Sequence, residues 1–564
     1  MERTTPVLPV PESGRLCDLL ERNAQLYADE TALVELNPIH DDAKNLLWKD
    51  YALVETGHSS HYRSELTWKQ FDDRANRVAN MLIAHGVKRG DKVAILLMNC
   101  IEWLPIYFGV MKTGALAVPM NFRYTSEEIA YCAELSQATI LFFASEFLER
   151  VEAVRQSDLM AGVREYIWLG LDVPAYATSF EAEVEKFGAD RPDIAATIKP
   201  EDDGAIYFSS GTTGFPKAIL HSHNGLYTAA ITEFMHHGQT HDDVFLLIPP
   251  LYHTGAKMHW FGSLVAGGKT ILLKGTDPGW VLDTAAKEQA SIVWLLVPWA
   301  RDILDYIESH LDEVKALDFS RWRIMHMGAQ PIPPSLVRRW KEHFPTHDYD
   351  TNYGLSESTG PGCVHLGVGN DHKVGAIGKA GHGWQTRVVD ENGAEVPRGT
   401  VGELIVKGPG VMREYFRNPE ATAESLKDGW LYTGDMAMED EDGFLFLVDR
   451  KKDVIITGGE NIYPVQVEDF LNAFAPVKDV AVIGIPDERL GEIALAVIEL
   501  KPGTEASPET EAAVWAYLED LPRYKRPRRI VFEPVPRNAT GKIEKPKLRK
   551  RFHADAIVAQ QTAE

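Results

Sequence analysis

Apolar positions in the first part of the chain alternate between helical and extended spacing. From Thr67 onward, apolar residues recur every three or four positions, which places them on one helical face. They are Phe71, Ala75, Val78, Ala79, Leu82 and Ile83. Gly86 ends this helix, and the short apolar run 93–98 that follows suits a strand covered on both faces of a parallel sheet. A second helix is predicted over 101–112.

The alternation continues downstream. Thr125, with Glu128 three positions later, forms a capping box that opens a third helix, and 139–144 is another buried strand. Repeated helix and strand predict βαβ units and an α/β fold with parallel sheets. Residues 37–64 break the rhythm and are interpreted as an extended insertion or a hairpin without an assigned purpose. Short strands with Gly and Pro turns are predicted over 393–411.

Composition narrows the class of protein. The 564 residues include 58 Lys plus Arg and 82 Asp plus Glu, a net charge of −24, which disfavours nucleic acid and anionic lipid as partners. The longest apolar stretch, 292–300, is about half of a membrane span, and the first residues lack the apolar run of a signal peptide. Four cysteines without CxxC spacing suggest neither a disulfide scaffold nor a zinc site. We therefore expect a soluble cytoplasmic protein that is not integral to a membrane.

The segment 207–217, YFSSGTTGFPK, carries the strongest chemical signal. Hydroxyl side chains and glycines alternate there after a predicted strand: Ser209, Ser210, Gly211, Thr212, Thr213 and Gly214. Glycines let a phosphate approach backbone N–H groups, the hydroxyls add donors, and Lys217 adds a positive charge. A Walker A loop is disfavoured, because Phe215 and Pro216 precede the lysine and Ala218 follows it.

This segment resembles the phosphate loop of the adenylate-forming superfamily, which includes acyl- and aryl-CoA synthetases, peptide-synthetase adenylation domains and beetle luciferases. Further motifs resembling those of the family follow in order across 66–551: PPLYHTG (249–255), GAQP (328–331), NYGLSES (352–358), YTGD (432–435), DRKKD (449–453), TGGENIYPVQVE (457–468) and RNATGKIEK (537–545). The resemblance implies a large N-terminal domain, 1–449, of βαβ-type sheets plus a β-rich subdomain. It also implies a small mobile α+β C-terminal domain, 450–564.

The resemblance also implies roles for individual residues. Catalytic roles fall to Lys542, His253, Thr212 and Lys217, and His253 is expected near the acyl carboxylate. Tyr353 would stack on adenine, while Ser356, where Thr is commoner in the family, would meet the α-phosphate. Glu357 would hold Mg²⁺, since a hard cation favours carboxylate and phosphate oxygens.

The other implied contacts concern the nucleotide, CoA and the hinge. Asp435 would bind the ribose, Arg450 would help to position the nucleotide, and Lys452 would be the pivot, where Asp is also common in the family. The implied nucleotide- and CoA-binding set is Ser209, Ser210, Gly211, Thr212, Thr213, Gly214, Lys217, Gly328, Ala329, Gln330, Tyr353, Gly354, Ser356, Asp435, Arg450, Gly458 and Gly459.

The Gly-Gly-Glu-Asn form at 458–461 resembles acyl-CoA synthetases rather than peptide-synthetase adenylation domains. Gly458 and Gly459 would offer a side-chain-free surface to a pantetheine arm. The chain ends about twenty residues after Lys542, so no carrier domain is expected, and its last residues are not a Ser-Lys-Leu peroxisomal address. The implied substrates are a small-molecule carboxylic acid, ATP with Mg²⁺, and coenzyme A, joined through an acyl-adenylate.

Two other functions remain open. One is a luciferase-like or carrier-independent enzyme that uses acyl-AMP without CoA. The other is a non-catalytic nucleotide or acyl-CoA sensor, which the presence of Glu357 and Lys542 disfavours.

The acid is less well defined. By resemblance, the acyl pocket is lined from about 225–232, 253–260, 326–328 and 357–363. Lys257 and His259 are less apolar than a long-chain tunnel requires, although either could face outward. Medium-chain, branched, alicyclic and aromatic acids therefore stay open beside long-chain ones, and so does a homodimer.

One segment departs from the acidic character of the chain. Residues 523–551 contain 12 Lys or Arg and 2 Asp or Glu, a net charge of +10. This segment is interpreted as a docking surface for the phosphates of CoA, with an acidic face of the large domain as the alternative partner.

Overall fold

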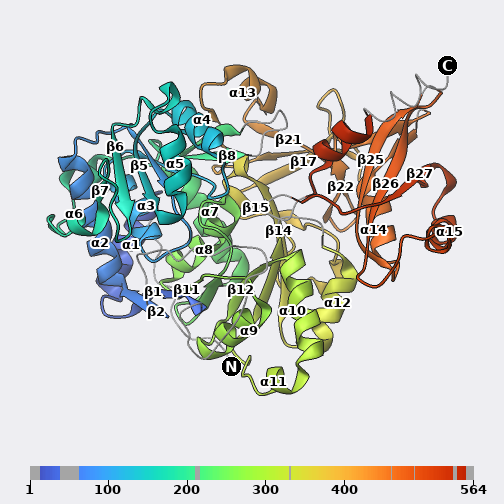
Figure 1. The fold of residues 1–564 in the computed structure, drawn as a ribbon, viewed down its shortest axis with the longest axis horizontal. Coiled ribbons are helices and arrows are strands. Elements are labelled where there is room, and N and C mark those ends of the chain that lie inside the picture. The colour runs from blue at the N-terminus through green and yellow to red at the C-terminus, as the bar shows by residue number, and fades with distance from the viewer. Residues whose placement is uncertain are drawn as a thin grey trace. The chain divides into compact units, whose positions relative to one another are not determined.

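The computed structural model describes residues 13–38, 62–209, 216–328, 332–458, 460–487, 489–537 and 543–553. The chain divides into two compact units (Figure 1). Unit 1 comprises Met1–Gly328, Pro334–Thr386 and Val406–Leu431. Unit 2 comprises Ala329–Pro333, Arg387–Ile405 and Tyr432–Glu564.

An eight-stranded sheet forms one half of unit 1. Its spatial order is β19 (Glu414–Tyr415), β9 (Lys217–Ser222), β8 (Asp203–Ser209), β4 (Leu116–Pro119), β3 (Lys92–Leu96), β5 (Ala138–Ala144), β6 (Glu165–Leu169) and β7 (Thr178–Ser179). The central strands β4, β3, β5 and β6 pair in parallel, whereas β8 and β9 form an antiparallel hairpin that β19 extends. The predicted βαβ arrangement is therefore confirmed.

A nine-stranded sheet forms the other half of unit 1. Its order is β16 (Lys379–Ala380), β15 (Gly360–His365), β14 (Asp348–Leu355), β13 (Ile324–Gly328), β12 (Ile292–Leu296), β10 (Val244–Leu247), β11 (Lys269–Leu273), β1 (Thr31–Leu36) and β2 (Arg63–Thr67). Parallel pairing of β12, β13 and β14 sets Trp294, His326 and Asp350 side by side in one row. Neighbouring residues in such a row point to the same face of the sheet.

Helices connect and cover these strands. In unit 1 they are α1 (Leu16–Leu26), α2 (Trp68–Ala84), α3 (Trp103–Lys112), α4 (Ser126–Ser136), α5 (Leu148–Val154), α6 (Phe180–Val184), α7 (His223–His237), α8 (Thr254–Ala266), α9 (Pro278–Lys287), α10 (Val297–Ser309), α11 (Leu311–Lys315), α12 (Pro334–His343) and α13 (Pro419–Ser425). The helices α7 and α8 pack against each other and against β15 (Figure 1).

Unit 2 contains strands of two smaller sheets, together with helices. One sheet has the order β17 (Gln385–Val389), β18 (Gly402–Lys407), β21 (Trp430–Glu439) and β20 (Leu426–Lys427), with β22 (Leu445–Arg450) on β21. The other has the order β24 (Glu460–Ile462), β23 (Ile455–Thr457), β26 (Gly491–Leu500) and β25 (Val477–Asp487), with β27 (Arg529–Phe532) on β26. Its faces bury two apolar clusters. The helices among the described residues of unit 2 are α14 (Pro464–Asn472), α15 (Pro508–Tyr517) and a further helix over 545–553.

Local sequence signals agree with the helix starts. The Thr125–Glu128 capping box is present at α4, and Thr67 forms a second one with Gln70 at α2. Each supplies hydrogen bonds that the first helical turn cannot make internally. Ile83, predicted on the buried face of α2, is instead 38% exposed. It lies one residue before the C-terminal end of the helix, next to the fully buried Leu82.

The interruption at 37–64 is partly described. The strands that flank it, β1 and β2, pair antiparallel with Leu36 opposite Arg63. This pairing is that of a long-looped hairpin, as one of the two interpretations expected. Residues 39–61 lie outside the described part of the chain.

Candidate active site

The β8–β9 hairpin positions the predicted phosphate loop. Ser209 ends β8 opposite Lys217, which begins β9. The loop residues Ser210, Gly211, Thr212, Thr213 and Gly214 lie outside the described residues. The ammonium group of Lys217 lies 4.7 Å from the ring centroid of Tyr415, which β19 sets beside β9. Cation–π contact with this ring holds the lysine at the base of the loop.

Tyr415 also reaches the predicted magnesium ligand. Its hydroxyl donates a hydrogen bond to Oε1 of Glu357 at 2.8 Å. Burial and the facing carboxylate raise the pKa of Tyr415, so the hydroxyl keeps its proton. The backbone oxygen of Glu357 accepts a bond from the N–H of Met412 at 2.7 Å. Tyr415 thus connects Lys217 with Glu357, although no sequence motif had singled it out.

Ser356 precedes Glu357 in a short 3₁₀ turn, Ser356–Ser358, that follows β14. His221 donates from Nε2 to the backbone oxygen of Ser356 at 2.7 Å. Burial lowers the pKa of His221 to about 4, so this ring is neutral near pH 7. The hydroxyls of Thr254 and Ser356 lie 3.1 Å apart, which joins the PPLYHTG and NYGLSES motifs.

His253 is the N-cap residue of α8. Its Nδ1 accepts a hydrogen bond from the N–H of Gly255 at 3.1 Å. A neutral imidazole that accepts at Nδ1 carries its proton at Nε2. The local turn therefore sets the tautomer of His253 as an Nε2 donor.

The remaining predicted residues of unit 1 lie at strand ends. Gly328 ends β13, and Tyr353 and Gly354 lie near the end of β14. The thiol of Cys363 donates to the backbone oxygen of Tyr353 at 3.1 Å, which braces the aromatic position. Ala329 and Gln330 lie outside the described residues.

Lys257 and His259 both face inward, so the option that they point outward is wrong. Both are at most 1% exposed. The ammonium nitrogen of Lys257 lies 4.1 to 5.1 Å from the ring centroids of Trp103, Tyr107 and Tyr207. Burial lowers the pKa of Lys257 well below its usual value, and none of the described carboxylates forms an ion pair with it.

His259 belongs to a buried cluster of histidines and acids that sequence reasoning missed. Its Nδ1 lies 2.9 Å from Oε2 of Glu233, whose Oε1 accepts from Asn352 at 3.0 Å. His365 lies 3.3 Å from the same carboxylate. Burial alone would raise the pKa of Glu233. His259 and His365 instead hold this pKa well below its usual value. The Glu233–His237 spacing on α7 was the only local signal, since the other members come from α8 and from distant strands.

In unit 2, two predicted nucleotide-binding residues pair with each other. Asp435 lies opposite Arg450 on β21 and β22, and Nε of Arg450 lies 2.9 Å from Oδ1 of Asp435. Gly458 has φ +59°, a conformation that a residue with a side chain rarely adopts. Partial desolvation lowers the pKa of Lys452, although the residue is exposed. Gly459 and Lys542 lie outside the described residues.

The basic segment 523–551 is partly neutralised within unit 2. Five of its cations pair with carboxylates: Arg537 with Asp479, Lys545 with Glu468, Lys547 with Glu544, Arg549 with Asp453 and Arg551 with Glu533. Arg523, Arg528 and Arg529 are exposed on and before β27. Lys550 is exposed as well, so the exposed cations that these ion pairs leave in the described part of the segment lie at 523–529 and at Lys550.

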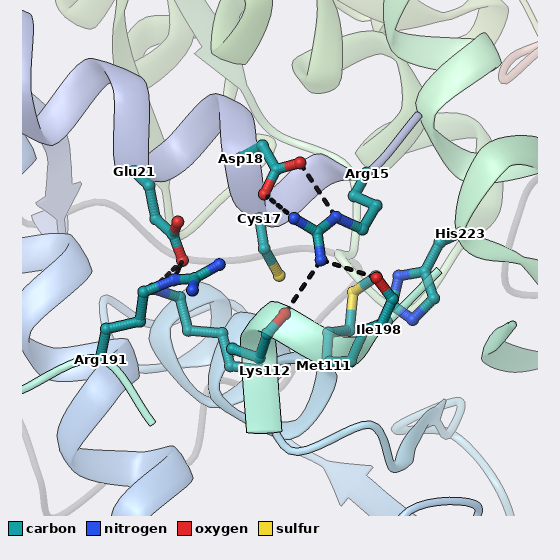
Figure 2. A pocket seen from close by; sticks show the side chains of 10 residues that line it. Arg15, Cys17, Asp18, Glu21, Met111, Lys112, Arg191, Ile198 and His223 are labelled. Carbon is teal, nitrogen blue, oxygen red and sulfur yellow. Dashed lines mark hydrogen bonds and ion pairs between the residues drawn. The ribbon is translucent and has the colours of Figure 1, made fainter. Parts of the chain in front are cut away.

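A small cavity of about 10 Å³ lies elsewhere in unit 1 (Figure 2). Arg15 lines this cavity and forms an ion pair with Asp18 at 2.6 Å. Its guanidinium group also donates hydrogen bonds to the backbone oxygens of Ala195 and Ile198. Its volume is about that of one water molecule. Arg15, Asp18 and Glu21 in its lining form ion pairs, whereas both ring nitrogens of the buried His223 have no hydrogen-bond partner among the described residues. Its lining includes none of the predicted site residues.

The parallel sheets, the hairpin loop and the polar groups around Glu357 define the chain as a nucleotide-binding α/β protein. Residues 20–416 match the family model of the AMP-binding enzymes, and residues 466–542 match that of the AMP-binding enzyme C-terminal domain. The chain belongs to the AMP-binding enzyme family.

Relatives with assigned activities refine this result. The chain is 31% identical over 495 residues to a long-chain-fatty-acid–CoA ligase, FadD13, of Mycobacterium tuberculosis, covering 87% of this chain and 93% of that one. It is 33% identical over 495 residues to a feruloyl-CoA synthase of an Amycolatopsis species, covering 87% and 95%. The structure of the anthranilate CoA ligase AuaEII with anthranoyl-AMP matches with a TM-score of 0.83 at 27% identity, covering 98% and 99%.

The chain is therefore an AMP-forming acid–CoA ligase of the adenylate-forming superfamily, with ATP and CoA as substrates. Within the described part of the chain, no helix is long and apolar enough to cross a membrane.

Proposed function

We propose that the groups around Glu357 bind MgATP and that a carboxylate substrate attacks its α-phosphorus there, giving acyl-AMP and diphosphate. The observation that carries the proposal is the link from Lys217 through Tyr415 to Glu357, continued to Thr254 by Ser356. A cation, a carboxylate and three hydroxyls from four chain segments therefore lie beside the phosphate-loop hairpin. Such a set suits the binding of a triphosphate and the neutralisation of its charge.

We assign the residues as follows. Lys217, Thr212 and the loop N–H groups contact phosphate oxygens, and Ser356 contacts the α-phosphate. His253 donates from Nε2 to the substrate carboxylate, consistent with its tautomer. Tyr353 and the 328–330 turn hold adenine, while Asp435 accepts from the ribose hydroxyls once Arg450 releases or shares it.

The donor set fits Mg²⁺. Glu357 presents a carboxylate whose Oε1 is held by Tyr415, beside the hydroxyl of Ser356. Carboxylate and phosphate oxygens together suit a hard divalent cation. When bound, the cation would offset the negative charge that builds as diphosphate leaves.

The second half-reaction is proposed to use unit 2. The thiol of CoA attacks the acyl carbon of acyl-AMP, and the bond to the phosphate oxygen breaks, which releases AMP. We assign the pivot to Lys452, at the start of a mobile domain that comprises 450–564 and follows the N-terminal domain 1–449. Gly458 and Gly459 leave room for pantetheine, and Arg523, Arg528 and Arg529 offer charges to the CoA phosphates.

The two half-reactions can be tested separately. Lys542→Ala is expected to abolish diphosphate exchange into ATP but to spare thioester formation from supplied acyl-AMP. Lys452→Pro is expected to do the reverse, since proline fixes φ and resists rotation. Lys547→Ala, which removes an exposed lysine of the same segment, is the matched control and keeps both activities.

A loss of both half-reactions in Lys542→Ala at an unchanged unfolding temperature would contradict the assignment of Lys542. Wild-type protein that exchanges no labelled diphosphate with a broad set of acids would contradict the whole proposal. Product formation that does not depend on CoA would favour the luciferase-like alternative.

We infer that the acid is compact, either aromatic, alicyclic or of medium chain length. A long alkyl tunnel needs an apolar lining. The segments expected to line the acyl pocket instead contribute His259 and His326, which lie against the carboxylates of Glu233 and Asp350. The names of the relatives cover long-chain, ferulic and anthranilic acids, so these names do not select one class of acid. The inference therefore rests on the residues of the pocket.

A panel of carboxylic acids tests this inference. Diphosphate release measured at saturating ATP and CoA should give a kcat/KM for the best compact acid at least about tenfold above that for palmitate, a preference of ~1.4 kcal/mol. A preference for palmitate over every compact acid would refute the inference while leaving the reaction class intact.

A further inference from the structure

Three side chains of types that bind metals converge in the core of unit 1, and none of them is assigned to ATP. His237 ends α7, His326 lies on β13 and Asp350 lies on β14. All three are at most 2% exposed. Nε2 of His237 lies 2.9 Å from Nδ1 of His326 and 3.0 Å from Oδ2 of Asp350. The third side of this triangle, from His326 to Asp350, is 3.5 Å.

These separations match a metal-ligand triangle. A tetrahedral ion with bonds of about 2.0–2.1 Å holds its ligand atoms about 3.3 Å apart. The three separations lie on either side of that value, so shifts of a few tenths of an ångström would complete the geometry. The atoms come from three separate elements, so the sheet and α7 hold them together without a ligand.

Protons alone satisfy the triangle poorly. The Nε2–H of His237 cannot point at both His326 and Asp350, which it meets at nearly equal distances. If His326 carries its proton on Nδ1 and donates to Asp350 over 3.5 Å, the ring nitrogens of His237 and His326 then face each other as two donors at 2.9 Å. A cation at the centre of the triangle would satisfy all three atoms at once.

The surroundings support the ligands in the way that metal sites require. Nδ1 of His237 lies 3.6 Å from Oε2 of Glu233, so a carboxylate backs the histidine. The second oxygen of Asp350 accepts from the N–H of Gly367 at 2.9 Å, which fixes the carboxylate plane. Nδ1 of His365 lies 3.9 Å from Oδ2 of Asp350 and offers a fourth ligand after a small side-chain shift.

We propose that His237, His326 and Asp350 form a binding site for one divalent ion of the zinc class, which fastens the end of α7 to β13 and β14. Two imidazoles and one carboxylate favour Zn²⁺ or Co²⁺ over Mg²⁺ and Ca²⁺, which prefer all-oxygen shells. None of the three residues has a role in the proposed adenylation chemistry, although His326 belongs to a segment expected to line the acyl pocket. Ion binding displaces the proton that His237 shares with its neighbours.

Metal analysis of the full-length chain, purified without a histidine tag or chelators and in the absence of nucleotide, tests the proposal. One zinc ion per chain is expected by mass spectrometry. After stripping with dipicolinate, Co²⁺ should bind with a sub-micromolar Kd and give the intense visible bands of a four-coordinate site. Addition of Zn²⁺ should raise the thermal unfolding midpoint of the stripped protein.

Asp350→Asn and His326→Gln should each weaken Co²⁺ binding by at least about 100-fold, since even outer partners of a ligand change metal affinity 10- to 100-fold. His347→Phe is the matched control, because it removes another buried histidine of unit 1 and should leave Co²⁺ binding unchanged. Equal Co²⁺ binding by Asp350→Asn and wild type would overturn the proposal.

The wild type alone supplies a second readout if the variants fail to fold. X-ray absorption of the bound metal should show two imidazole scatterers at about 2.0 Å. A six-coordinate, all-oxygen shell, or purified protein that neither contains nor takes up a zinc-class ion, would overturn the proposal as well. Each of these readouts is independent of whether the chain forms an acyl-adenylate.

Discussion

At the scale of single residues, the side chain that does most to arrange the proposed nucleotide site is one that no motif had indicated. Tyr415 offers its ring to Lys217 and its hydroxyl to Glu357. It lies 58 positions from Glu357 in the chain. A tyrosine in that sequence context reads as an ordinary edge-strand residue, and only the pairing of β19 with β9 brings it to the site.

Tyr415→Phe separates these two contacts, because it removes the hydroxyl and keeps the ring. A hydrogen bond to a charged group contributes about 1.5–3 kcal/mol. We therefore expect diphosphate exchange to slow roughly 10- to 100-fold and the Mg²⁺ concentration for half-maximal exchange to rise, because Glu357 loses its orientation. Thioester formation from supplied acyl-AMP should stay within about twofold of wild type.

Tyr415→Leu is the comparison variant, since it also removes the ring beneath Lys217 and should raise the KM for ATP. A purely structural role for Tyr415 predicts lower exchange with an unchanged Mg²⁺ dependence. That result would remove Tyr415 from the positioning of Glu357.

At the scale of elements, the sequence predicts most of the fold, because local rules dictate it. Apolar periodicity predicted α2, a capping box predicted α4, and short apolar runs predicted the parallel strands β3 and β5. The motifs also predicted which loops carry the polar groups of the site, and these loops directly follow strands. In the described part of unit 1, Ser356, Glu357 and Lys217 do lie in one polar network.

The inward orientation of polar residues on α8 was beyond local rules. Lys257 and His259 look like solvent-facing positions on a helix, yet rings from α3 and β8 enclose the lysine, and Glu233 of α7 meets the histidine. Each partner is a tertiary contact with no trace in the spacing of α8 itself. The cluster of His237, His326 and Asp350 was missed for the same reason, since its members combine α7 with a row of parallel strands.

At the scale of the whole molecule, charge is distributed unevenly. The chain carries −24 overall, and the basic segment 523–551 opposes this with +10. Five ion pairs within unit 2 use part of that charge, so the stretch 523–529 keeps the clearest exposed cations. Several histidines of unit 1 are, in addition, buried in the neutral form, so protonating them would oppose folding.

His347 shows how this burial connects stability to pH. Its ring stacks on Trp322 and Phe344 at centroid distances of 4.7 and 4.4 Å, and Nδ1 accepts from the indole of Trp340. Burial, and secondarily the charge of Lys341, lower its pKa to about 3. The unfolded chain binds a proton at this histidine near pH 6.5 and the folded chain does not. Stability from this group is therefore complete above about pH 6.5 and is lost as the pH falls toward 3.

His347→Phe should remove that dependence while keeping the stacked ring. The variant loses the acceptor for Trp340, which costs about 1 kcal/mol at every pH, so the two proteins should differ by a constant amount above about pH 7. Below pH 6.5 the wild type should lose stability faster than the variant, by about 1.4 kcal/mol per pH unit. Urea unfolding of both proteins at several pH values between 7.5 and 5 measures the difference. Parallel stability curves over that range would show that His347 takes up its proton in the folded state.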